Sequence, residues 1–230
     1  GEAELDEALR YLDIWTDPAL RAPDPQEERS LLDLTTAAPA GTECYSQWLA
    51  SCRLRIDYPT HIQPLWLLDR RSFDPDTDEL LSDHSCLSCH SRTDAAGNAR
   101  LPIAQLELDA EPSDQEPEHY RSYRELLSND FEQELVGGVL VDRQVQATDA
   151  DGNPIFITDD DGNLIPVMVR VTVTPALRAN SALAGAAFFD RFAAGGSHFG
   201  YLTDAELMLL AAWLDIGAQY YNSPFVIPEQ

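Results

Sequence analysis

The sequence predicts a mainly α-helical fold with a small antiparallel β insertion and an extended N-terminal segment. Apolar residues recur at helical spacing near the C-terminus, whereas β-branched runs separated by turn residues are confined to about 139–173. The first 40 residues are acidic and are interrupted by four prolines. In a chain of 230 residues we therefore expect an N-terminal extension with short helices over 1–50, followed by a domain over 51–230.

The first half of the domain is expected to contain short helices and loops. Thr60 is placed to cap a helix that carries Ile62 and Trp66 on one side. The Asp-rich segment 69–83 is expected to be a loop, and a short helix is expected over 120–127.

The β insertion contains two turn signals that lie ten residues apart, Asp-Ala-Asp-Gly-Asn at 149–153 and Asp-Asp-Asp-Gly-Asn at 159–163. Asp-Gly-Asn between β-branched runs is typical of hairpins. The same aspartates resemble half of a calcium-binding loop, but neither copy has the glutamate that completes such a loop six residues after the glycine. Hairpins are therefore the favoured interpretation, and calcium is the less favoured one.

The C-terminal part is expected to be helical. An Ala- and Phe-rich helix is expected over 181–192, followed by a Gly-rich loop over 195–200. Thr203, with Glu206 three residues later, forms a capping box, which predicts a helix that ends near Gly217.

Residues 86–90 read Cys-Leu-Ser-Cys-His, the C-x-x-C-H pattern of covalent haem attachment. Cys86 and Cys89 have the spacing that forms thioether bonds to the two vinyl groups of one porphyrin, and His90 then supplies the proximal imidazole. A zinc site or a redox dithiol is the alternative. Zinc would need two further ligands, and the chain has no second C-x-x-C and no H-x-x-x-H; a dithiol would need a βαβ context, which is not predicted. We therefore predict one haem c, held in a cytochrome c-like helical haem domain over 51–230.

The cellular compartment follows from this chemistry. Bacteria attach haem covalently outside the cytoplasmic membrane, so we expect a periplasmic or extracellular protein whose signal peptide has been removed. The sequence has no apolar run long enough to span a bilayer. In an oxidising compartment, Cys44 and Cys52 are expected to form a disulfide that closes a short loop; two separate buried thiols are the alternative.

The net charge is −25, from 40 acidic and 15 basic residues, and every basic residue is an arginine. Nucleic-acid binding is excluded, because phosphate contact needs a basic surface. The favoured role of the acidic surface is solubility. The alternative role is an electrostatic match to a basic redox partner.

Haem iron has a second axial position, whose occupant decides between electron transfer and ligand binding. His198 is favoured as the distal ligand, because it lies in a Gly-rich loop that can approach a porphyrin closely and is far from His90 in sequence. Met168 is the alternative, and a methionine would raise the potential. A solvent-exposed loop position for His198 stays open as well. The other candidates are His61, His84, His119 and Met208.

Two arginines follow the motif. Arg92 and Arg100 are placed either to pair with haem propionates or to pair with aspartate side chains, since guanidinium geometry suits carboxylates.

Four parts of the sequence carry a family resemblance: 56–66, 86–91, 188–192 with 195–198, and 213–222. Together they resemble c-type cytochrome proteins that are related to the hydrazine synthase alpha subunit. The resemblance covers about 50–225 and implies a cytochrome-like helical domain in the bacterial envelope. It does not imply hydrazine synthesis, because that activity in the named enzyme depends on several haems and subunits, whereas this chain has one haem motif.

The sequence therefore predicts a monohaem c-type cytochrome that carries single electrons through a bis-histidine haem, rather than an enzyme. No nucleophile elbow and no zinc-protease signature is present. Two alternatives stay open: an enzyme or gas-binding protein with an open five-coordinate haem, and a haem-bearing structural subunit of a larger redox assembly. The expected partner is accordingly a redox protein, basic if charge governs the match, or a set of neighbouring haem subunits.

Overall fold

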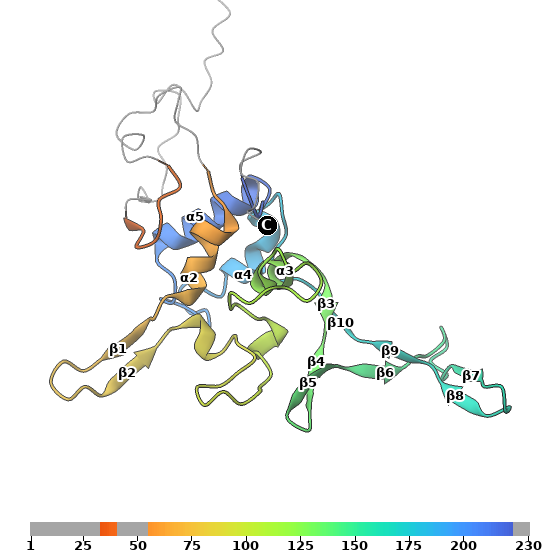
Figure 1. Ribbon diagram of the computed structural model, residues 1–230. Helices are drawn as coiled ribbons and strands as arrows, with labels where there is room; N and C mark the ends of the chain where they lie inside the picture. Colours follow the sequence, from red (N-terminus) through yellow and green to blue (C-terminus); the bar gives the residue numbers. More distant parts are fainter. Residues whose placement is uncertain (1–32, 41–54, 223–230) are drawn as a thin grey trace, which may run out of the picture. The chain divides into compact units, whose positions relative to one another are not determined.

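The computed structural model describes residues 33–40 and 55–222 (Figure 1). The chain divides after Ser30, and all the described residues belong to the unit 31–230. The predicted disulfide between Cys44 and Cys52 and the domain boundary near residue 50 lie outside the described residues. The short helices expected in the extension fall outside them in the same way.

The described elements are short, and helices and strands are both present. The helical elements are a π-helical turn Tyr58–Ile62, α2 Gln63–Leu67, a 3-10 turn Cys86–Ser88, a 3-10 turn Ile103–Gln105, α3 Arg121–Leu127, a 3-10 turn Leu183–Gly185, α4 Ala186–Phe189 and α5 Asp204–Asp215. The strands are β1 Arg71–Phe73, β2 Leu80–Asp83, β3 Asp130–Phe131, β4 Gln133–Val136, β5 Val139–Asp142, β6 Gln144–Gln146, β7 Phe156–Thr158, β8 Leu164–Pro166, β9 Met168–Arg170 and β10 Thr172–Val173.

The prediction of a mainly α-helical, cytochrome c-like fold is wrong. The described residues contain four short α-helices, while ten strands form five two-stranded sheets. Segments shorter than about 12 residues become helical only where packing supports them. The helix expected over 181–192 is accordingly reduced to a 3-10 turn and the four residues of α4. The described chain is therefore a mixed α and β structure.

The segment 69–83, which was expected to be a loop, forms the β1–β2 hairpin. Arg71 pairs with Asp83 at its base, in antiparallel register. Asp74 accepts the amide hydrogen of Thr77 at 2.9 Å, which fixes the turn. The aspartates of this segment thus mark the hairpin turn, and the residues on either side of them are strands.

Antiparallel strands are present where the insertion was expected, and they begin earlier, at Asp130. The structure gives Asp149 and Asp159 a role in the hairpin tips. Asp149 Oδ1 accepts the amide hydrogen of Asn153 at 2.9 Å, and Asp159 Oδ1 accepts that of Asn163 at 2.7 Å. These turn hydrogen bonds lower the pKa of both aspartates.

One hydrophobic core joins α2, α3 and α5 (Figure 1). Tyr58 lies at its centre. The centroid of its ring is 5.1 Å from that of Tyr123 and 5.4 Å from that of Trp213. The Tyr58 hydroxyl donates to Ser122 Oγ at 2.9 Å and accepts from Trp66 Nε1 at 3.2 Å, so this buried polar group is satisfied. Burial raises the Tyr58 pKa well above its ordinary value.

The helix predicted after Thr203 is confirmed as α5. Thr203 Oγ1 accepts the Glu206 amide hydrogen at 3.2 Å, and Glu206 Oε2 accepts the Thr203 amide hydrogen at 2.8 Å. The helix cap predicted at Thr60 is wrong, since Thr60 lies inside the π-helical turn and Asp57 occupies the cap position. None of the described helices is long and apolar enough to cross a membrane.

Candidate haem site

The C-x-x-C-H motif begins on a single 3-10 turn. The amide hydrogens of Cys89 and His90 both bond to the Cys86 carbonyl oxygen, at 3.2 and 2.9 Å. Side chains three residues apart overlie one another on such a turn, so the two thiols lie on one side of it. Cys86 packs against the hydrophobic core, and burial raises its thiol pKa to about 11, whereas Cys89 is exposed.

Arg100 holds the backbone of the motif. Its guanidinium donates to the Leu87 carbonyl at 2.8 Å, to the Ser91 carbonyl at 3.1 Å and to the Ser91 hydroxyl at 2.7 Å. Arg92 follows the second of its two predicted roles and pairs with acids, with its Nε 2.6 Å from Glu107. The backbone role of Arg100 was not predicted, because no sequence pattern distinguishes an arginine that bonds carbonyls from one that bonds carboxylates.

The His90 imidazole is oriented by a backbone carbonyl. Its Nδ1–H donates to the Leu106 oxygen at 3.0 Å, while the Leu108 amide donates to the His90 carbonyl at 2.9 Å. Because a carbonyl only accepts, Nδ1 carries the proton and Nε2 keeps its lone pair for a metal. Burial lowers the His90 pKa and so favours the neutral imidazole, which is the form that binds metals.

The His198 imidazole is carried by the Gly-rich loop. The His198 amide donates to the Arg191 carbonyl at 2.8 Å, and Ser197 Oγ lies 2.8 Å from His198 Nδ1. A Cβ at Gly196 would clash with the backbone carbonyls of Asp190 and Arg191, so only glycine fits in this turn. Partial burial, followed by the charge of Arg191, lowers the His198 pKa.

The structure brings His90 and His198 together from positions 108 residues apart in the sequence. Their ring centroids are 6.2 Å apart, with 31° between the ring planes. A metal–imidazole bond of about 2 Å and a distance of about 1.1 Å from ring nitrogen to ring centre would separate two imidazole centroids that share one metal ion by about 6.2 Å. The residues present therefore fit a bis-histidine haem.

Two aromatic residues that sequence reasoning missed surround the distal histidine. The Phe192 ring lies 5.6 Å from the His198 ring, and the Tyr201 ring lies 5.1 Å from it in an edge-on arrangement. In the sequence, the only indication of these neighbours is their proximity to His198, six residues before it and three residues after it. Both rings contact the imidazole and so restrict its orientation.

The other candidate histidines make contacts that do not involve the His90 ring. His84 stacks on Tyr201 with 4.2 Å between centroids, and His119 Nδ1 lies 2.8 Å from Glu116. His61 is buried and accepts the amide hydrogen of Asp57 at 3.0 Å.

The candidate methionines lie in regular elements. Met168 pairs opposite Gln146 in the β6–β9 ladder, where its side chain is about half exposed. Met208 lies within α5.

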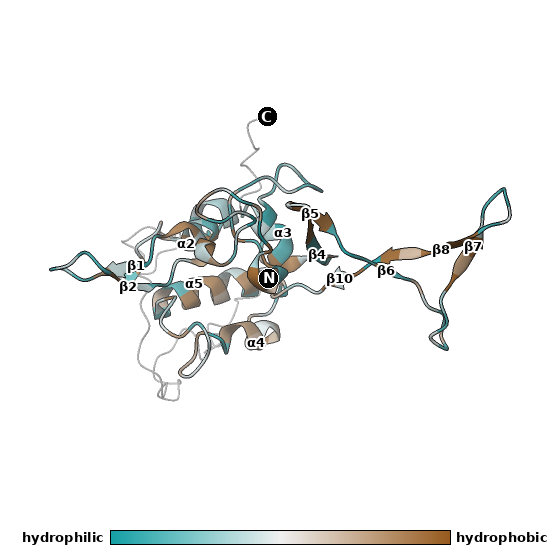
Figure 2. Cartoon of the chain, turned by 90° about the horizontal axis from the view of Figure 1, so that it is seen from below, coloured by the Kyte–Doolittle hydropathy of each residue, from teal (hydrophilic) through white to brown (hydrophobic). Residues whose placement is uncertain are grey.

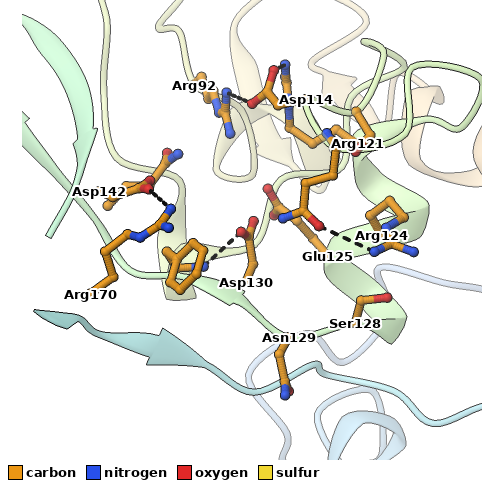
Figure 3. Close-up of a pocket in the computed structure, with 14 residues that line it drawn as sticks. Arg92, Asp114, Arg121, Arg124, Glu125, Ser128, Asn129, Asp130, Asp142 and Arg170 are labelled. Carbon is orange, nitrogen blue, oxygen red and sulfur yellow. Dashed lines mark hydrogen bonds and ion pairs between the residues drawn. The ribbon is translucent and has the colours of Figure 1, made fainter.

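A polar cavity of about 220 Å³ lies beside α3 (Figure 3). Arginines and carboxylates line it and pair with one another, as Figure 3 shows for Arg92 with Asp114 and for Arg170 with Asp142. Because Arg92, Arg121 and Arg170 already pair with aspartates of the lining, the cavity indicates no particular ligand.

Glu125, which lines this cavity, shares a buried site with Glu107. The Glu107 backbone amide donates to the Glu125 carboxyl, and Glu107 also pairs with Arg121 at 2.9 Å. Burial raises the pKa of Glu125 to about 9 and that of Glu107 to about 7. Arg92 and Arg121 favour an ionised Glu107, so Glu125 is the residue that holds a proton at neutral pH.

Comparisons with models of protein families, with curated proteins and with solved structures found no match. Within residues 33–40 and 55–222, no three or more histidine, cysteine, aspartate or glutamate side chains are grouped so as to hold a metal ion. The account of function therefore depends on the motif and on the geometry around it.

Proposed function

We propose that this chain is a monohaem c-type cytochrome that carries single electrons outside the cytoplasm. Cys86 and Cys89 attach the haem, His90 is the proximal ligand and His198 is the distal ligand. The observation that carries the proposal is the 6.2 Å separation of the two imidazole rings, which is the separation that one shared iron requires. Haem iron supplies one-electron redox chemistry, and a bis-histidine pair gives it a low potential relative to a histidine–methionine pair.

The protein contributes orientation and protonation state. The Leu106 carbonyl fixes the tautomer of His90, and the glycine-dependent turn at Gly196 lies next to His198 in the loop. Two ligands from the chain leave no axial position for a substrate, which favours electron transfer over ligand binding. His198 is favoured over Met168 because the ring of His198, and not the ladder position of Met168, lies beside His90.

Three further expectations belong to the same proposal. The relationship to c-type cytochromes akin to the hydrazine synthase alpha subunit is proposed from the sequence segments alone. A periplasmic or extracellular location follows from covalent haem attachment. A role as a haem-bearing subunit of a larger redox assembly is the second candidate, and the apolar strands exposed in β6–β9 favour it.

The test is to produce the chain with a haem-maturation system and to measure both its mass and its redox titration. We expect the mass to rise by one haem, Cys86→Ala with Cys89→Ala to remove that increase, and the titration to follow a one-electron curve. A wild-type chain that gains no haem under conditions that mature a control cytochrome would overturn the proposal. Conversion of a small substrate by the haem protein would instead favour an enzyme.

A further inference from the structure

Strands β6–β9, residues 144–170, form a ribbon of paired strands that is rich in exposed apolar side chains; we call these residues the apolar ribbon. Figure 2 colours β7 and β8 as hydrophobic. Eight large apolar side chains in this ribbon are between 38% and 68% exposed. They are Val145, Ile155, Phe156, Ile157, Leu164, Ile165, Met168 and Val169.

Among the residues that the structure describes, none covers either face of the ribbon. Consecutive residues of a strand point to opposite faces, so Phe156 and Ile157 lie on different faces of β7. Both are exposed, and so is Ile165, which pairs opposite Ile157. A two-stranded ribbon on its own is marginally stable in water, and its apolar residues gain most when another surface covers them.

The strands of the ribbon also leave open edges. In the described part of the chain each of these strands has a single neighbour, β6 with β9 and β7 with β8. Pro166 removes one backbone donor from β8, whereas β7, Phe156–Thr158, contains neither proline nor a charged residue to protect its edge. An extended segment of a partner can therefore pair with β7 by strand addition.

The charge around the ribbon indicates what kind of segment fits. Five aspartates lie in residues 144–170, against a single basic residue, Arg170, which already pairs with Asp142 at 3.1 Å. Turn hydrogen bonds lower the pKa of Asp149 and Asp159, so these two stay ionised. A second copy would bring the same acidic rim and a net charge of −25, so like charges oppose self-pairing at this surface.

We propose that the apolar ribbon is a docking surface for a partner protein that supplies an extended segment in which apolar side chains alternate with lysine or arginine. The backbone of that segment pairs with the open edge of β7, its apolar side chains pack beside Ile157 and Ile165 on one face of the ribbon, and its basic side chains meet the aspartates of the hairpin tips. The inference goes beyond electron transfer and does not depend on haem.

The test uses the whole chain and two synthetic probes, a short peptide of alternating valine and lysine and a peptide of the same length and charge with serine in place of valine. Calorimetric titration should show the valine–lysine peptide binding at least about tenfold more tightly than the serine–lysine peptide, with an affinity that falls as salt rises. Equal affinity for both peptides would mean that charge alone attracts them, and would overturn the proposal.

Matched variants locate the site. Ile157→Thr combined with Ile165→Thr removes an apolar cross-strand pair from one face of the ribbon and keeps strand propensity, and we expect it to weaken binding of the valine–lysine peptide about tenfold. Leu183→Thr changes a side chain that is 86% exposed and lies outside the ribbon, and it should leave binding unchanged. All three positions are exposed, so the variants should keep the circular dichroism spectrum of the wild type.

Two further outcomes would also overturn the proposal. Binding that the ribbon variant does not weaken would place the peptide elsewhere and overturn the proposal. Analytical ultracentrifugation of the chain without peptide measures its oligomeric state and so tests whether a second copy occupies the ribbon. A dimer that the ribbon variant abolishes would make a second copy the occupant, against the partner proposed here.

Discussion

The Arg70–Glu206 ion pair joins the segment before β1 to the start of α5, and its removal should measurably weaken the fold. Arg70 Nη2 lies 2.8 Å from Glu206 Oε1, and the two side chains are 14% and 1% exposed. Glu206→Gln keeps a side-chain oxygen that can still complete the capping box, so the substitution isolates the loss of charge. It leaves the Arg70 guanidinium largely desolvated without an anionic partner.

The expected cost is about 2 kcal/mol in the free energy of unfolding. Hydrogen bonds to charged groups contribute about 1.5 to 3 kcal/mol, and the retained amide oxygen offsets part of the larger loss expected for a broken buried pair. Urea unfolding followed by tryptophan fluorescence gives this value as a shift of the midpoint at constant slope.

The matched control is Asp69→Asn. The Asp69–Arg71 pair is shorter, at 2.6 Å, but its side chains are 58% and 49% exposed. Because solvent screens exposed pairs, the control should change stability far less than Glu206→Gln. If the two variants lose the same stability, burial does not govern the strength of these pairs and the reasoning is refuted.

Three further predictions follow from the core, the buried acids and the distal loop. Leu209→Ala should lower the free energy of unfolding, measured in urea, by about 3 to 5 kcal/mol, because Leu209 is fully buried. Leu183→Ala at an exposed position should lower it by less than about 0.5 kcal/mol, and similar losses in both variants would contradict the placement of Leu209 in the core. Burial raises the folded-state pKa of Glu125 to about 9, from about 4.3 in the unfolded chain, so the free energy of unfolding should fall as pH rises between these values. Glu125→Gln should flatten this pH dependence, and an unchanged slope would contradict a protonated Glu125 in the folded state. Gly196→Ala should push the His198 loop away from the site and convert part of the haem to the high-spin form in the absorption spectrum; a fully low-spin spectrum would contradict the role of this turn.

The sequence predicted the features that a few neighbouring residues determine. The capping box at Thr203 and the hairpin tips at Asp149 and Asp159 depend on contacts within four residues, and they form as expected. The C-x-x-C-H motif is equally local, and the prediction of haem attachment follows from the spacing of Cys86 and Cys89.

The fold class depended on tertiary packing and was not predictable in the same way. Apolar spacing at 181–192 indicates a helix, but the structure keeps helical geometry mainly at 183–189. The hairpin over 71–83 was hidden by its Asp-rich turn. The Arg100 contacts reach back to Leu87 and Ser91, and the aromatic neighbours of His198 lie in the same irregular segment, where periodicity carries no information.

The central claim is that His90 and His198 bind one haem iron from opposite sides, and the low-temperature EPR and optical spectra test it most directly. The wild-type haem protein should be low-spin with bis-histidine character, and His198→Ala should convert it to high-spin. His84→Ala, which removes the histidine stacked on Tyr201, is the matched control and should stay low-spin. A wild type that is already high-spin, or a low-spin spectrum that survives His198→Ala, would contradict the account.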